Sequence, residues 1–69
     1  MLVFRRSMRT GSWVAVDELG PTDEVRPAME AATWVSDREL RMAERWSMSA
    51  VFRLGKFIGF VRRDDQGDS

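Results

Sequence analysis

The chain has 69 residues, which is enough for one domain with one small hydrophobic core. It contains no cysteine and no histidine, which excludes disulfides and the usual zinc sites. Eleven basic and eleven acidic residues give a net charge of zero, so the overall field favours neither nucleic acid nor any other charged partner. An apolar content of 43% is typical of a folded domain, and a homodimer or another partner would supply the stability that disulfides and metals do not.

Residues 2–19 have the pattern of a β-hairpin with a two-residue turn at Thr10-Gly11. Such a turn would place the Arg5-Arg6 pair diagonally near the Asp17-Glu18 pair. We interpret this arrangement as cross-strand charge pairing, which contributes a few tenths of a kcal/mol to about 1 kcal/mol. The alternative is that the two arginines form a basic site for phosphate.

A break at Gly20-Pro21 ends the hairpin, and residues 22–24 form a polar connector. Pro27 suits the first position of a helix, because the N–H that proline lacks would be unpaired there. The sequence therefore predicts a short helix over residues 28–35.

A second helix is predicted from Ser36 to about Trp46. Ser36 is followed three residues later by Glu39, which is the spacing of a capping box. At roughly 100° per residue the helix has one apolar arc and one charged arc. The apolar arc, expected to lie on the sheet, contains Leu40, Met42, Ala43 and Trp46, and the charged arc contains Asp37, Arg38, Arg41, Glu44 and Arg45.

The most apolar run, residues 50–61, predicts a second hairpin at the centre of the sheet, because it is rich in aromatic and β-branched residues. Gly55-Lys56 fits a type II′ turn, which needs glycine first. One face of this hairpin is then the predicted core: Phe52, Leu54, Phe57 and Val61. One long helix is the alternative, but its two interior glycines would each cost about 1 kcal/mol. The run is too short for a membrane span, which needs roughly 20 apolar residues.

Together these elements predict an α+β domain in the order ββααββ. Two hairpins form one antiparallel sheet, and the helices between Pro27 and Trp46 cover one face of it. We expect the domain to occupy residues 1–63 and a flexible charged tail to occupy residues 64–69. The first residues carry charge after a short apolar stretch, unlike a secretory signal, so a cytoplasmic location is expected.

The side-chain inventory predicts a protein without catalytic residues, cofactor or metal. Histidine, cysteine and tyrosine are absent, so the common general bases and nucleophiles are missing. A serine–lysine pair would have to use Lys56, which we expect at a turn in water. Neighbouring carboxylates such as those of Asp64 and Asp65 point to opposite sides of an extended chain and do not form an acid–base pair.

Binding is therefore the expected function, and two groups of residues are candidates for contacting a partner. Three tryptophans are more than so small a domain usually buries, so we expect Trp34, near the helix junction, to be exposed. Tryptophan beside arginine has the composition of a binding hot spot. The first group is Trp34, Arg38, Arg41 and Arg45, and the second is Asp17, Glu18, Asp23 and Glu24.

The arginine stripe has two other interpretations. Ion pairs from Arg41 to Asp37 and Glu44 would make it an ordinary solvated helix face. Alternatively, Arg38, Arg41 and Arg45 would bind nucleic acid directly, although a dedicated nucleic-acid-binding domain usually has a clear excess of basic residues.

In its size and its lack of catalytic groups, the chain resembles the small inhibitor proteins of phages and mobile elements, including anti-CRISPR proteins. The resemblance is one of class and involves no shared motif, so it assigns no residue. It implies stoichiometric binding to a larger protein or nucleoprotein machine, without catalysis. The acidic pairs Asp17-Glu18 and Asp23-Glu24 would then be candidates for contacting a basic channel. A toxin or antitoxin partner would have the same features.

Overall fold

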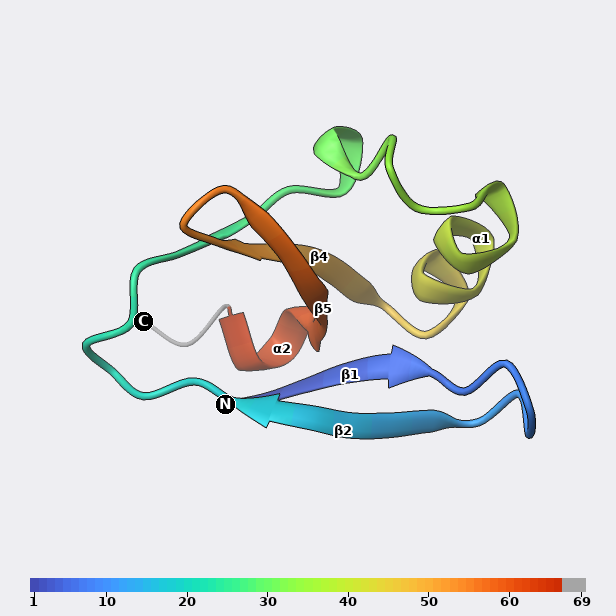
Figure 1. Cartoon of the computed structure of the whole chain (residues 1–69), viewed down its shortest axis with the longest axis horizontal. Helices are drawn as coiled ribbons and strands as arrows, with labels where there is room; N and C mark the ends of the chain where they lie inside the picture. Colours follow the sequence, from blue (N-terminus) through green and yellow to red (C-terminus); the bar gives the residue numbers. More distant parts are fainter. Residues whose placement is uncertain (67–69) are drawn as a thin grey trace.

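The computed structural model describes residues 1–66, which form a five-stranded antiparallel sheet and one helix packed against it (Figure 1). The strands lie in the order β2-β1-β5-β4-β3. The elements are β1 (Leu2–Arg6), β2 (Trp13–Glu18), β3 (Val25–Pro27), a 3-10 turn (Met29–Ala31), α1 (Asp37–Arg45), β4 (Met48–Arg53), β5 (Lys56–Arg62) and α2 (Arg63–Gln66). The α+β class is confirmed, whereas the order ββααββ is not matched, because a third strand is present and the first predicted helix is only a 3-10 turn.

The first hairpin, β1–β2, forms as predicted, but its loop is longer than two residues. Ser7 N–H donates to the Ser12 carbonyl oxygen at 2.7 Å, and Gly11 N–H donates to the Ser7 carbonyl oxygen at 2.7 Å. These bonds close the loop and place Arg6 opposite Trp13. The predicted turn at Thr10-Gly11 is therefore wrong, and so is the predicted charge pairing, since Arg5 lies opposite Val14.

Pro27 belongs to an edge strand and not to a helix. It lies opposite Val51 in the ladder between β3 and β4, and no strand pairs with the other side of β3 in the described chain. Proline is tolerated on an edge because its missing donor removes no ladder bond there. Ala28 continues the extended path, with φ −158°, and its N–H donates to the Ala50 carbonyl oxygen. Helical structure in this segment is confined to the 3-10 turn, which corrects the predicted helix over 28–35.

The helix α1 begins as the capping box predicts. Ser36 is its N-cap, and the Ser36 hydroxyl accepts a hydrogen bond from Glu39 N–H at 3.3 Å. The helix ends at Arg45, and Trp46 is its C-cap. The chain then turns through Ser47, whose φ is 54°, into β4. Trp46 is consequently 57% exposed, which corrects its predicted place in the core.

The second hairpin, β4–β5, occupies the interior of the sheet as predicted, and the long-helix alternative is excluded. Its turn lies one residue earlier than expected. Leu54 and Gly55 both have positive φ, 52° and 79°, as a type I′ turn requires. A bulge between Val51 and Phe52 shifts the register further along the ladder. Leu54 is therefore 84% exposed, which corrects its predicted place in the core.

The sheet buries apolar side chains on both faces. The helix-side cluster contains Ala32, Val35, Ala43, Met48, Ala50, Phe52 and Phe60. The cluster on the other face contains Val3, Leu19, Val51 and Val61. The segment from Leu19 to Glu24 runs from one edge of the sheet to the other, and Leu19 covers the second cluster (Figure 1). The prediction of a single covered face is therefore incomplete.

The chain continues after β5 into a short helix, α2. This helix forms the start of the predicted tail, and residues 67–69 lie outside the described residues. Within residues 1–66, no helix has the length and apolar character needed to cross a membrane.

Candidate functional site

Two adjoining hollows open where β3, β4 and the turn of the second hairpin meet. One has a volume of about 260 Å³ and the other about 360 Å³. They share the walls formed by Arg26, Phe52 and Gly55, so they form one continuous depression. We call it the Trp34–Leu54 surface, and its lining residues are Glu24, Arg26, Ala28, Trp34, Phe52, Leu54 and Gly55.

Trp34 forms one wall of this surface and is 75% exposed, which confirms the expectation that it lies partly in water. Its ring meets that of Phe52 edge to face, with 6.2 Å between centroids. Phe52 in turn packs against Phe57 at 5.8 Å, and Phe57 against the buried Phe60 at 5.4 Å. A continuous series of aromatic contacts therefore connects the exposed tryptophan to the core.

Leu54 forms the opposite end of the surface, and nothing in the fold explains its presence there. The first central position of a type I′ turn has positive φ and strongly prefers asparagine, aspartate or glycine. A leucine there has an unfavourable backbone conformation and, at 84% exposure, gains almost no burial. Our sequence interpretation missed Leu54, because it placed Gly55 first in the turn. Gly55 also fits the second central position, which makes Leu54 the first residue of the turn.

The charged residues of this surface are Arg26 and Glu24, both exposed and close together on the β3 side. Among residues 1–66, neither side chain forms an ion pair. The floor between them and Trp34 is the aromatic ring of Phe52. The surface therefore combines an apolar hollow with an unpaired guanidinium at its edge, which would suit a partner that presents an apolar side chain next to a carboxylate.

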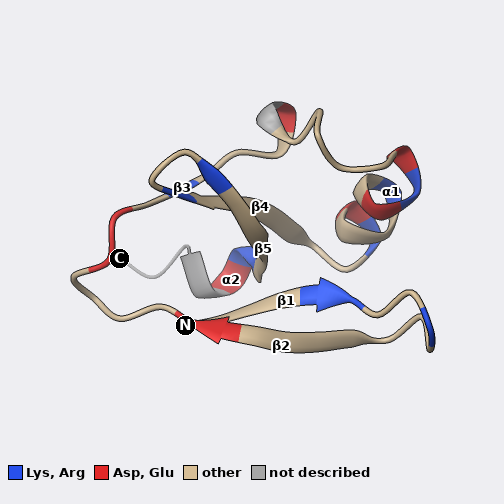
Figure 2. Ribbon diagram, in the orientation of Figure 1, with Lys and Arg blue, Asp and Glu red and all other residues tan. Residues whose placement is uncertain are grey.

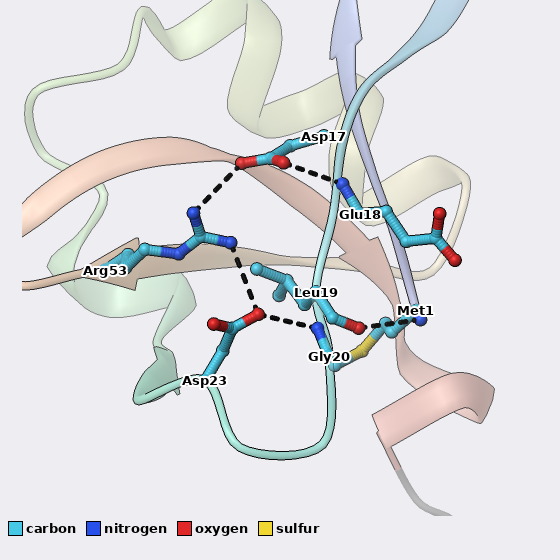
Figure 3. Close-up of polar contacts among 7 residues, drawn as sticks. All are labelled: Met1, Asp17, Glu18, Leu19, Gly20, Asp23 and Arg53. Atoms are coloured by element: carbon cyan, nitrogen blue, oxygen red, sulfur yellow. Dashed lines mark hydrogen bonds and ion pairs between the residues drawn. The ribbon is translucent and has the colours of Figure 1, made fainter.

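Two of the four acidic candidates form ion pairs with an arginine of the sheet, so they differ from the unpaired charges of the Trp34–Leu54 surface (Figure 3). Arg53 on β4 forms ion pairs with Asp17 at 3.3 Å and with Asp23 at 3.6 Å. Both carboxylates also accept backbone hydrogen bonds, Asp17 from Glu18 N–H at 2.8 Å and Asp23 from Gly20 N–H at 2.6 Å. The structure thus brings Asp17 and Asp23 together around Arg53 and leaves the side chains of Glu18 and Glu24 exposed.

The contact between Arg53 and Asp17 joins two strands that are not neighbours in the sheet. Strands β2 and β4 are separated by β1 and β5, which corresponds to about 14 Å in a flat sheet. The long arginine side chain spans most of this separation, and the two side chains meet over the second apolar cluster. Asp17 and Arg53 are far apart in the sequence, and no pattern in the sequence predicted their contact.

The arginine stripe lies on α1, and none of its three arginines lines the hollows. Arg38, Arg41 and Arg45 are all exposed, and acidic residues alternate with them along the ribbon (Figure 2). In the part of the chain that the structure describes, α1 contains no ion pair, so the expected bonds from Arg41 to Asp37 and Glu44 are not formed. Trp34 lines the first hollow, whereas none of the three arginines lines either one.

Residues 1–66 contain no group of three carboxylate, histidine or cysteine side chains arranged to hold a metal ion. The chain matches no protein-family model, no curated protein and no solved structure at a significant level. Its function is therefore inferred from the exposure and contacts of its own residues.

Proposed function

We propose that this protein is a non-enzymatic binding module that docks on a larger protein or nucleoprotein complex through the Trp34–Leu54 surface. The observation that carries the proposal is Leu54, an exposed leucine held at positive φ where a turn favours other residues. Residues that break local folding rules without a structural gain are concentrated at functional sites. A partner that covers Leu54 would provide that gain.

The energies support this interpretation. A left-handed conformation costs a residue other than glycine about 1–2 kcal/mol. Complete burial of a leucine side chain contributes about 1.5–3 kcal/mol. Leu54 therefore weakens the free protein slightly, and its contribution to a complex would offset that cost.

Trp34 supplies the second anchor. Binding hot spots are enriched in tryptophan and arginine that surround a desolvated pocket, and this surface has Trp34 on one wall and Arg26 on another. Because the Trp34 ring already rests against Phe52, little side-chain freedom would be lost on binding. The partner is expected to insert an apolar side chain over Phe52 and to place a carboxylate near Arg26.

Inhibition by occupying a functional surface is the form of binding that we favour. The chain is small, carries no net charge and lacks the usual catalytic side chains, so its effect on a partner would be steric. The class resemblance to anti-CRISPR proteins and other phage inhibitors points in the same direction. Stoichiometric binding would then block the partner's own ligand.

Affinity capture of the tagged protein from a lysate of its source, with and without nuclease, tests this proposal. We expect a stoichiometric protein partner that survives nuclease treatment. Trp34→Ala should abolish its capture, because the aromatic wall of the hollow is lost. Trp46→Ala is the matched control, since Trp46 is also exposed but does not line the hollow, and it should capture normally. Equal capture by both variants would refute the assigned surface.

Direct binding to nucleic acid is the second candidate. The observation that favours it is the set of exposed arginines on α1 that lack ion pairs within the described residues. Its signature would be the loss of all captured material on nuclease treatment, together with the loss of binding in the Arg41→Glu variant. Captured protein that resists nuclease and does not depend on Arg41 would exclude this candidate.

A further inference from the structure

The strand β2 forms an open edge of the sheet. It pairs with β1 on one side, and within residues 1–66 no strand pairs with its other side. The bond from Ser7 N–H to the Ser12 carbonyl shows that Ser7 and Ser12 are a hydrogen-bonded pair of the β1–β2 ladder. Because bonded and non-bonded pairs alternate in antiparallel strands, the N–H and C=O groups of Trp13 and Ala15 point away from β1. These groups are free to bond with another strand.

The side chains on this edge are apolar and exposed. Val14 is 48% and Val16 is 52% exposed, and Ala15 between them is also exposed. Natural edge strands are usually protected by lysine, proline or very short length. The other edge of this sheet, β3, has such protection, because it is only three residues long and ends at Pro27. Residues 13–15 contain neither lysine nor proline, and the bulge at Val16, another common protection of edge strands, lies after them.

Charge is distributed unevenly along the same edge. Arg6 and Arg9 lie at the end where β2 begins, and Asp17 and Glu18 lie at the end where it stops (Figure 2). If two copies of the strand pair antiparallel about a twofold axis, the basic end of each faces the acidic end of the other. A parallel arrangement would bring like charges together.

We propose that the partner of this edge is a second copy of the chain, with β2 paired antiparallel to β2 about a twofold axis at Val14. In this register the outward N–H and C=O groups of Trp13 meet those of Ala15 of the second copy, Val14 lies beside Val14 of the second copy, and Glu18 lies beside the loop that carries Arg9 of the second copy. Such an interface is isologous, as in most homodimers, and it joins the two sheets into one. The Trp34–Leu54 surface lies beside β3 at the opposite edge, so the dimer exposes two copies of it.

Sedimentation velocity on the untagged protein, from micromolar to millimolar concentration, tests this interface. We expect the mass to rise from 8.0 kDa to twice that value. Val14→Lys places a charge on the edge and should remain monomeric at every concentration. Its thermal melting should show a folded chain, and Val16→Lys replaces it if Val14→Lys does not fold. A wild-type chain that stays monomeric, or a dimer unaffected by the lysine variants, would overturn the proposal.

A charge exchange makes the test specific to the antiparallel register. Glu18→Arg alone should raise the dimer dissociation constant about tenfold, since the contact occurs twice. Combining it with Arg9→Glu should restore wild-type dimerisation, and failure of the double variant to do so would contradict the register. Leu54→Asn should leave the dimer unchanged, which separates this interface from the docking surface proposed above. A dimer lost through Leu54→Asn would refute pairing through β2.

Discussion

Gly59, in the middle of β5, occupies a position where the sheet leaves no room for a side chain. Its φ is +153°, and a Cβ atom would lie 2.6 Å from Val3 Cγ1 and 2.8 Å from the Phe4 carbonyl oxygen. Because the second obstacle is backbone, it cannot move aside easily. Gly59 therefore sets how closely β5 approaches β1.

Replacing Gly59 with alanine should destabilise the protein by about 3 kcal/mol, through backbone strain and overpacking. The free energy of unfolding from urea denaturation measures this loss. Gly55→Ala is the control, because Gly55 also has positive φ but has no atom within 4 Å of the added Cβ. It should lose only about 1–2 kcal/mol. Equal losses in the two variants would contradict the close approach of β1 and β5.

Predictions for single residues were right where they depended on nearby residues in the sequence, and they were wrong or missing where they depended on residues of another strand. The exposure of Trp34 followed from the small size of the domain, and the Ser36 cap followed from its spacing to Glu39. The need for glycine at position 59 arises from Val3 and Phe4 on another strand. The role of Leu54 depended on which residue began the turn, and a change of one position moved it from the expected core into solvent.

Arg53 connects three elements that are distant in the sequence. Through Asp17 and Asp23 it joins β4 to the end of β2 and to the segment that leads into β3. The same segment carries Leu19, whose N–H and carbonyl both bond to Met1 (Figure 3). These contacts hold the connecting segment over the second apolar cluster.

Arg53→Met should lower the free energy of unfolding by about 1–2 kcal/mol, because it removes both ion pairs but keeps an apolar stem. The estimate is small since the side chains of Arg53 and Asp17 are 31% and 39% exposed, so water screens the pair. The difference from wild type should narrow in high salt. Arg41→Met, at an exposed arginine with no ion pair in the described chain, should change stability by less than about 0.5 kcal/mol. Equal losses of unfolding free energy in the two variants would show that Arg53 does not stabilise the contact between these elements.

The long elements, and those with clear start or turn signals in the sequence, could be predicted. The capping box located α1, and the aromatic and β-branched run located β4 and β5. The strand β3 was missed because it has only three residues and ends in a proline that also suits the start of a helix. Bulges in both hairpins changed the register. The bulge in the first hairpin has no marker in the sequence, whereas the bulge in the second lies beside Gly59, and a glycine inside a strand often marks a bulge.

At the scale of the whole molecule, the predicted hairpins and helices indicated the α+β class, but they did not indicate a sheet with two buried faces. The second face carries the contact between Arg53 and Asp17, which joins strands that are not neighbours in the sheet. Asp17 and Asp23 pair with Arg53, whereas the acidic candidate Glu24 lines the Trp34–Leu54 surface. The sequence therefore indicated an exposed tryptophan, but it did not reveal the hollow beside it.

The measurement that tests the central claim most directly is a pair of assays on the single variant Leu54→Asn. Asparagine is favoured at this position of a type I′ turn, so the melting temperature should rise by a few degrees. Capture of the protein partner should be lost, because the exposed leucine is gone from the surface. A more stable protein that no longer binds would establish Leu54 as a residue that serves binding at a cost to the fold. Unchanged capture by Leu54→Asn would contradict the proposed docking surface.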